Sequence, residues 1–306
     1  MTGAGASMVD AMRALVAEPR LVVPDPGSGA TPERHRALFE VARTGPVSLA
    51  RLAEAHTDAI SILHEAGLEP HPSASYGVWA SEVPGSAVRI DLQANRLRGT
   101  KPFCSGLGAI DRALVTVVDE DLGKELLVEV DVASSATLSH DTSAWTTPAL
   151  AESSTGAVRF DEHPVVRIVS PVHRWYLQRP GFWHGACGPA ACWAGAAVGL
   201  VDVAERMVDG DPHRRAHLGA MRALAWGLEA VLDRAGREID AAPHDADAAQ
   251  ARALAVRHLV ERSAAEVLDR FGTALGPRPF VADADVWQRF ADVHLYLRQD
   301  HGERDL

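Results

Sequence analysis

The sequence has few cysteines and no excess of basic residues. Three of its 306 residues are cysteines, at positions 104, 187 and 192, and none of them stands in a CxxC spacing. This pattern gives no basis for a zinc site or for a disulfide framework. Acidic residues outnumber basic ones by 41 to 30, for a formal charge of -11, so no basic field exists to hold nucleic acid or an anionic membrane. We expect no nucleic-acid partner, no membrane and no metal.

Long apolar runs are also missing. The N-terminal segment carries acidic residues early and has no apolar stretch of signal-peptide quality. The longest uncharged apolar run, from Ala186 to Val201, is shorter than the ~20 residues that a membrane-spanning helix needs. With 47% hydrophobic and 23% charged residues, the composition is that of a globular protein of about two domains. We expect a cytoplasmic protein whose partners are small molecules or copies of itself.

The first seventy residues show helical periodicity. An amphipathic stretch at 8–23 is followed by a Pro/Gly/Ser linker, and Thr31 before Pro32 is typical of a helix cap with proline at the first helical position. Leu49, Leu52 and Leu63 keep a helical period in the next helix until Gly67 ends it. The sequence therefore predicts a short N-terminal helical domain over residues 1–70.

The pattern changes to short, β-rich runs after residue 70. Such runs, punctuated by glycine, occupy 76–80, 87–92, 113–118, 125–130, 157–160 and 165–169. Strands of this length and spacing favour a small antiparallel β-barrel or sandwich over residues 71–172.

Long helical patterns fill the rest of the chain. They cover 185–208, 213–239, 246–272 and 286–300, and the linkers between the first three are short and rich in helix breakers. Short connections between long helices imply antiparallel neighbours, so residues 173–306 are predicted to form a four-helix bundle. The first of these helices is unusually rich in glycine and alanine. We expect it at the centre of the bundle or in a subunit interface, because small residues let two backbones approach closely.

One bend in the β-rich region has the composition of a ligand site. The stretch 97–118 is predicted to be strand, exposed bend and strand, and its bend holds Phe103, Ser105 and Gly106. An aromatic side chain beside a hydroxyl, on backbone that glycine lets approach a ligand, can form the wall of a flat heteroaromatic site. A packed aromatic and an ordinary turn hydroxyl are the alternative interpretation.

The order of elements and four local patterns resemble the acyl-CoA dehydrogenase superfamily of FAD flavoproteins. The segment from Trp79 to Ser86 resembles the family's entry into its β domain, and Lys101, Phe103, Ser105 and Gly106 fit a family pattern in which an aromatic and a hydroxyl line the flavin. Two further stretches, 145–161 and 289–296, resemble its barrel-closing strand and its last helix. The resemblance implies a mostly helical fold with a central β-barrel, an N-terminal helical domain and a C-terminal four-helix bundle.

The resemblance also assigns roles to individual residues. Ser81, Phe103 and Ser105 fall at the positions that line the flavin ring, and Asp300 falls where many members carry the carboxylate that removes the α-proton of an acyl thioester. It implies FAD as cofactor, an acyl thioester as substrate, a homodimer or homotetramer, and an electron-transfer flavoprotein as possible partner. Asp300 also stands in a charged chain end, so a solvated tail is the alternative for this residue.

The phosphate-binding positions depart from the family pattern. The motif that holds the FAD pyrophosphate is present only as the run from Arg206 to Gly210, where Asp209 brings a negative charge close to the expected phosphates. His217 stands near a usual glutamine, and Arg270 could supply a compensating positive charge. Arg206 and Arg270 are the predicted phosphate ligands, with an exposed helix end as the alternative for Arg206.

Three functions follow from these observations. The first is an acyl-CoA dehydrogenase-like oxidoreductase acting on CH-CH groups, with Asp300 as base and hydride transfer to FAD. The second is a flavin-dependent monooxygenase or oxidase of the same fold, in which His301 contributes. The third is a non-catalytic homologue that has kept the fold, motivated by Asp209 and by the missing glutamate. The acidic loops around positions 244–247 and 283–285 lack the spacing of metal ligands and are interpreted as solvated loops.

Overall fold

The computed structural model describes residues 7–17, 21, 23–133 and 136–304. The chain divides into two compact units. The β unit comprises Met1–Val22, Ala55–Thr147 and Ala151–Phe182, and the helical unit comprises Val23–Glu54, Pro148–Leu150 and Trp183–Leu306. The division falls inside one helix, α3 (Val47–Glu65). Each unit is described by itself, and the predicted division into three domains stays a prediction.

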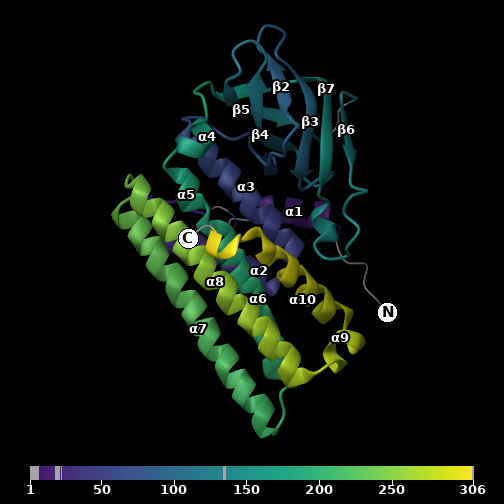
Figure 1. Cartoon of the computed structure of the whole chain (residues 1–306), viewed down its shortest axis with the longest axis vertical. Coiled ribbons are helices and arrows are strands. Elements are labelled where there is room, and N and C mark those ends of the chain that lie inside the picture. Colours follow the sequence, from purple (N-terminus) through teal and green to yellow (C-terminus); the bar gives the residue numbers. More distant parts are fainter. Residues whose placement is uncertain (1–6, 18–20, 22, 134–135, 305–306) are drawn as a thin grey trace. The chain divides into compact units, whose positions relative to one another are not determined.

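The β unit contains one eight-stranded sheet (Figure 1). Seven strands lie in the order β6-β7-β3-β2-β4-β5-β8, and β1 pairs in parallel with β4. The sheet has two ends, β6 and β8, so the expected closed barrel is not confirmed. The strands are β1 (Tyr76–Trp79), β2 (Val88–Asp91), β3 (Arg96–Cys104), β4 (Arg112–Asp119), β5 (Glu125–Asp131), β6 (Leu138–Asp141), β7 (Gly156–Pro164) and β8 (Arg167–Ser170).

Alternation along the central strands builds a core on each face of the sheet. In β4, Val115 and Val117 belong to the larger core, whereas Leu114 belongs to the second core together with Ile62 and Leu63 of α3. Successive side chains of a strand point to opposite faces, so a strand buried on both faces is apolar at almost every position. This requirement explains the continuous β-branched run that the sequence shows in β4.

A buried histidine joins α3 to the first strand. His56 is 6% exposed, and its Nδ1 accepts a hydrogen bond from the backbone N–H of Tyr76 at 3.1 Å. Only the neutral imidazole can accept at this nitrogen. Burial lowers the pKa of His56 to about 4, because desolvation disfavours the charged form.

The helical unit is built around α6 (Cys187–Met207), which is buried along most of its length. Figure 1 shows α6, α7 and α8 running side by side. Together with α2 (Thr31–Thr44), α9 (Arg278–Ala282), α10 (Ala284–Tyr296) and the first half of α3 they form this unit; a separate four-helix bundle is not confirmed. The two long helices beside α6 are α7 (Pro212–Ala241) and α8 (Ala246–Leu275).

Three shorter helices complete the chain. α1 (Met8–Ala17) and α4 (Trp175–Gln178) belong to the β unit, and α5 (Gly181–Gly185) spans the division between the units.

The predicted central position of the small-residue helix is correct. Against α2, a Cβ added to Gly195 would stand 2.0 Å from the carbonyl oxygen of Phe39. A Cβ on Gly199 would stand 2.7 Å from the carbonyl oxygen of Arg43. The stretch from Gly181 to Met207 is long and apolar enough to cross a membrane, but 78% of its most apolar window is buried inside the protein. It is therefore the core helix of this unit.

The start of α2 differs from the sequence prediction. Thr31 is the first residue of the helix and not its cap, and Ala30 at the cap position makes no side-chain hydrogen bond. Asp240 of α7 accepts from the backbone N–H of Thr31 at 2.9 Å and also from its hydroxyl. The N–H group of the first helical residue is thus satisfied by another helix, which the local sequence cannot show.

The contact between α6 and α2 gives a first prediction. Gly195→Ala should lower the free energy of unfolding by about 1–3 kcal/mol, because the added methyl group has no space against the α2 backbone. Gly272→Ala in α8 is the matched control, since a Cβ there meets no atom within 4 Å and alanine favours helix by up to about 1 kcal/mol. Urea unfolding of the two variants measures the difference. Equal stabilities would contradict the close contact.

His56 gives a prediction on pH. Because its folded pKa of about 4 lies below the ordinary histidine value of about 6.5, the unfolded chain binds a proton first as the pH falls. The stability contributed by neutral His56 is present above pH 6.5 and is lost between 6.5 and 4, by up to about 3 kcal/mol. The unfolding free energy of His56→Asn, which keeps an acceptor without titrating, should fall less over this window. Parallel pH profiles for the two proteins would refute the assignment.

Candidate functional site

The end of β3 projects an exposed aromatic ring from a strained turn of backbone. Lys101 pairs with Val158 and Cys104 pairs with Gly156, so Pro102 and Phe103 together stand opposite one residue of β7 and form a β-bulge. Phe103 has φ of 55° and is 58% exposed. A left-handed conformation is costly for an aromatic residue, and such strain concentrates at functional sites.

Hydrogen bonds on both sides hold the residues that follow the bulge. The indole N–H of Trp79 donates to the carbonyl oxygen of Ser105 at 3.0 Å, and the hydroxyls of Ser105 and Thr155 lie 2.9 Å apart. The backbone N–H of Gly106 donates to the carbonyl oxygen of Ser153 at 2.8 Å. The bend that presents Phe103 and Ser105 is therefore fixed to β1 and to the start of β7.

Ser81 lies in a segment fastened to the same end of β3. This exposed residue follows β1 and stands between Trp79, which holds Ser105, and Glu82, whose carboxylate lies 3.9 Å from the ammonium of Lys101. The structure thus brings the segments that carry Ser81, Phe103 and Ser105 together at one edge of the β unit. All three predicted ring-binding residues therefore belong to segments that meet at the end of β3.

The buried side chain of Lys101 fastens β3 to β4 beside the bulge. Its ammonium is buried and donates to the carbonyl oxygen and the hydroxyl of Thr116, at 3.0 and 2.6 Å. Burial lowers the pKa of Lys101. Because its ammonium makes two hydrogen bonds to Thr116 of β4, the Lys101 side chain anchors the bulged strand β3 to the interior of the sheet.

The predicted catalytic carboxylate, that of Asp300, lies in the helical unit. Asp300 directly follows the short 3-10 helix η3 (Leu297–Gln299). The side chain of Asp300 is 4% exposed, with one oxygen accepting from the backbone N–H of Gly302 at 3.0 Å and the other 3.9 Å from the guanidinium of Arg257. Arg257 also donates to the carbonyl oxygens of Ala186 and Gln299. Asp300 is therefore a buried, anchored side chain, and the alternative of a solvated tail does not hold for its carboxylate.

The predicted phosphate ligands also lie in the helical unit. Arg206 is exposed in the last turn of α6, and Arg270 in α8 forms an ion pair with Glu266, one turn earlier, at 2.6 Å. Asp209 forms an exposed ion pair with Arg214 at 3.3 Å. This pair partly offsets the negative charge of Asp209, which the sequence predicted to lie close to the flavin phosphates. Binding of a phosphate by Arg206 and Arg270 stays a prediction.

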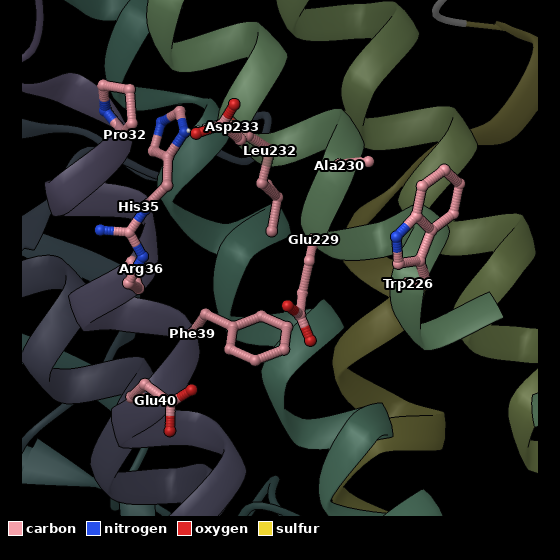
Figure 2. Close-up of a pocket in the computed structure, with 10 residues that line it drawn as sticks. All are labelled: Pro32, His35, Arg36, Phe39, Glu40, Trp226, Glu229, Ala230, Leu232 and Asp233. Carbon is pink, nitrogen blue, oxygen red and sulfur yellow. Dashed lines mark hydrogen bonds between the residues drawn. The ribbon is translucent and has the colours of Figure 1, made fainter. Parts of the chain in front are cut away.

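A groove on the helical unit was not foreseen from the sequence. It has a volume of about 330 Å³ and lies between α2 and α7 (Figure 2). Its lining includes the aromatic residues Phe39 of α2 and Trp226 of α7, together with Glu229 of α7 (Figure 2). His35 lines the groove and bonds the carbonyl oxygen of Leu232 at 3.0 Å.

The acidic loops serve as helix caps. Asp245 accepts from the backbone N–H of Ala248 at the start of α8, and Asp283 accepts from two backbone N–H groups at the start of α10. Within the described part of the chain, no group of three or more His, Cys, Asp or Glu side chains is placed to hold a metal ion.

No known family model and no curated protein matches the sequence. Solved structures do match. FMN-bound TdsC from Paenibacillus sp. A11-2 aligns with a TM-score of 0.77 and 15% identity over 97% of this chain and 93% of that chain. KijD3, in complex with FMN and a dTDP-linked amino-keto sugar, aligns with a TM-score of 0.80 and 15% identity over 98% and 85% of the two chains. The methanesulfinate monooxygenase MsuC from Pseudomonas fluorescens aligns with a TM-score of 0.74 and 17% identity over 98% and 95%.

TdsC, KijD3 and MsuC share one fold, and the structures of TdsC and KijD3 contain FMN. This chain has the acyl-CoA dehydrogenase fold. The resemblance found in the sequence is thereby confirmed for the fold, over nearly the whole chain. Identities of 15–18% leave the reaction to be argued from the residues themselves.

Two residues that hold predicted site residues of this acyl-CoA dehydrogenase fold could not be predicted from the sequence. Thr155 holds Ser105 by a hydroxyl contact, and its only local signal is its place next to Gly156 at the start of a predicted strand. Arg257 lies in the middle of α8, where arginine is common, and nothing near it in the sequence points to Asp300. Both act on residues distant in the chain.

The strained bulge gives a third prediction. Phe103→Gly should be more stable than Phe103→Ala by about 1 kcal/mol, because glycine adopts the left-handed conformation without steric cost. Both variants lose the ring equally, so the comparison isolates the backbone term. Chemical unfolding measures it, and an alanine variant at least as stable as the glycine variant would argue against a strained bulge.

Proposed function

We propose that the protein is a flavin-dependent monooxygenase that binds FMN and acts on a small organic substrate. The observation that carries the proposal is the exposed ring of Phe103, held in a strained conformation beside Ser105 and next to the Ser81 segment. Three neighbours of the same fold are described as monooxygenases or as FMN complexes. A flavin, when bound, supplies the chemistry that activates dioxygen.

The residues present at the end of β3 fit an isoalloxazine ring. A flat apolar face is available at Phe103, because more than half of the residue is exposed. The hydroxyl of Ser105 is oriented by Thr155, and that of Ser81 is exposed. Hydroxyls both donate and accept, so these side chains can bond the polar edge of the ring while Phe103 covers its face.

FMN fits the phosphate-binding residues better than FAD does. A single phosphate needs one cationic contact, for which the exposed Arg206 is suitable. The pyrophosphate of FAD carries a second phosphate and needs more positive charge, and Arg270, the other predicted phosphate ligand, already pairs with Glu266. FMN is also the flavin named in the neighbours' structures.

A second candidate is the acyl-CoA dehydrogenase-like reaction, with Asp300 removing the α-proton of an acyl thioester. The buried position of this carboxylate favours it. Against it, Asp300 already accepts from Gly302 and faces Arg257, so proton abstraction would weaken existing contacts. An acyl thioester, FAD and an electron-transfer flavoprotein belong to this second candidate. Location in the cytoplasm and a homodimer or homotetramer remain predictions for both.

The fourth prediction separates these functions. The purified protein should bind FMN, and Phe103→Ala should raise the dissociation constant at least tenfold because the stacking face is lost. Leu122→Ala is the control, since Leu122 is 66% exposed and lies in the turn between β4 and β5, away from the β3 bulge. Fluorescence titration with FMN and with FAD measures binding.

Turnover then discriminates between the two reactions. With chemically reduced FMN supplied, a monooxygenase incorporates oxygen from ¹⁸O₂ into substrate, and Asp300→Asn should keep this activity within about threefold. A dehydrogenase instead bleaches its flavin with an acyl thioester without oxygen, and Asp300→Asn would abolish bleaching. A protein that binds neither FMN nor FAD is the non-catalytic homologue, and the proposal would then be wrong.

A further inference from the structure

A buried histidine lines the groove between α2 and α7 and has one ring nitrogen without a partner. His35 is 2% exposed, and its Nδ1 lies 3.0 Å from the carbonyl oxygen of Leu232. A carbonyl oxygen only accepts hydrogen bonds, so Nδ1 carries a proton and is the donor. Nε2 has no hydrogen-bond partner among the described residues and is not enclosed by protein atoms, so it faces the groove that the ring lines.

The unbonded nitrogen of His35 is a hydrogen-bond acceptor. Burial lowers the pKa of this histidine because desolvation disfavours the imidazolium, and this effect outweighs the opposite influence of the Leu232 carbonyl and of Asp240. With the ring neutral and Nδ1 protonated, Nε2 keeps its lone pair and can only accept. Buried acceptors in proteins nearly always have a donor. The groove therefore has a place for an N–H or O–H group that the described part of the chain does not supply.

The charges around the groove leave one carboxylate without an ion pair. The charged residues that line the groove are Arg36, Glu40, Glu229 and Asp233. Asp233 is compensated by Arg237, 2.8 Å away, and by the guanidinium of Arg36, which together lower its pKa. Within the residues that the structure describes, Glu229 forms no hydrogen bond or ion pair, although it contributes at longer range to the raised pKa of Arg43. A positive charge in the groove is therefore favoured beside Glu229.

An aromatic ring stands on each of the two helices. Phe39 of α2 is 3% exposed and Trp226 of α7 is 76% exposed, so the first ring belongs to the floor of the groove and the second to its rim. Trp226 stands three residues before Glu229, which places both side chains on one face of α7. The face of an indole ring attracts cations. Ring and carboxylate together favour a cationic ligand over a neutral or an anionic one.

The acceptor and the carboxylate are close enough to contact one small ligand. His35 and Leu232 are joined by their hydrogen bond, and Phe39 and Glu229 lie about one helical turn further along the groove, or ~5 Å (Figure 2). The groove has a volume of about 330 Å³, at the lower end of the roughly 300–1,000 Å³ that small-molecule sites occupy. A ligand that contacts both groups therefore has few heavy atoms.

We propose that the groove between α2 and α7 binds a small organic amine in its protonated form. An N–H group of the ammonium donates to Nε2 of His35, and the positive charge lies beside Glu229 and Trp226. The apolar part of the amine packs on the floor, against Phe39 and Leu232. A primary or secondary ammonium meets both requirements, whereas a quaternary ammonium carries the charge but no N–H group. This site belongs to the helical unit and involves none of the residues proposed to bind the flavin.

Three ligands of similar shape separate the charge from the hydrogen bond. In calorimetric titrations of the full-length protein, 2-phenylethylammonium should bind with a dissociation constant below about 1 mM. Its N,N,N-trimethyl derivative keeps the charge without an N–H group and should bind at least about fivefold more weakly. The neutral 2-phenylethanol should bind at least about tenfold more weakly. Absence of binding by the primary ammonium, or equal affinity for all three ligands, would overturn the proposal.

Two substitutions test the two groups of the site one at a time. His35→Asn keeps an amide N–H that can donate to Leu232 in place of Nδ1 and removes the acceptor at Nε2. The primary and the trimethylated ammonium should then bind with equal affinity, within about twofold. Glu229→Gln keeps the size of the side chain and removes its charge, so the dissociation constants of both cations should rise at least about fivefold, with 2-phenylethanol unaffected.

A control variant and a second ligand make the result specific. Glu69→Gln removes the same charge at an exposed residue of the β unit and should leave amine binding unchanged. Circular dichroism should show native helix content for all variants. The groove variants should also bind FMN as the wild type does, so failure of this proposal is distinguishable from failure of the proposed function. Amine binding that neither His35→Asn nor Glu229→Gln alters would place the amine elsewhere and overturn the proposal.

Discussion

The helical unit depends on the contact of two backbones, α6 against α2, made possible by Gly195 and Gly199. Side chains at these positions would collide with the α2 carbonyls. Arg289 of α10 then donates to the carbonyl oxygens of Ala42 and Gly45, which satisfies the end of α2, and Asp240 of α7 satisfies its start. One helix, α2, is thereby fixed by three others, α6, α7 and α10.

In the β unit, hydrogen bonds within the sheet hold one residue, Phe103, in an unfavourable backbone conformation. The bulge that presents Phe103 has an unfavourable conformation, which persists because Trp79 and Thr155 hold Ser105 on one side and Lys101 anchors the strand on the other. Strain of this kind costs of order 1–3 kcal/mol and is retained only when surrounding contacts determine it. The ring therefore stays exposed where a flat ligand can cover it. The contacts of the sheet offset the free-energy cost of its backbone conformation.

Much of the fold could be predicted from periodicity, because the deciding forces are local or depend only on burial. The runs that became β1, β2, β4 and β5 were predicted within two residues, since buried strands require β-branched side chains at successive positions. The bulge in β3 could not be predicted, because it depends on the register with β7. The cap of α2 was predicted wrongly for a similar reason: Thr31 has a cap-like sequence, but Asp240, 209 residues away, takes that role.

The same distinction separates the predicted ring-binding residues of the β unit from the predicted phosphate ligands of the helical unit. The predicted ring-binding residues Phe103 and Ser105 lie within a few positions of one another at the end of β3, so a sequence pattern could identify them together. For the predicted phosphate ligands, the effect of Asp209 depends on whether a cation lies beside it, and Arg214 does so after the chain turns into α7. The negative charge that argued against a phosphate is thus partly compensated within its own turn. Arg270, the other predicted phosphate ligand, pairs with Glu266 one turn away, whereas Arg206 is exposed, and this difference is why we propose a ligand with one phosphate and not with two.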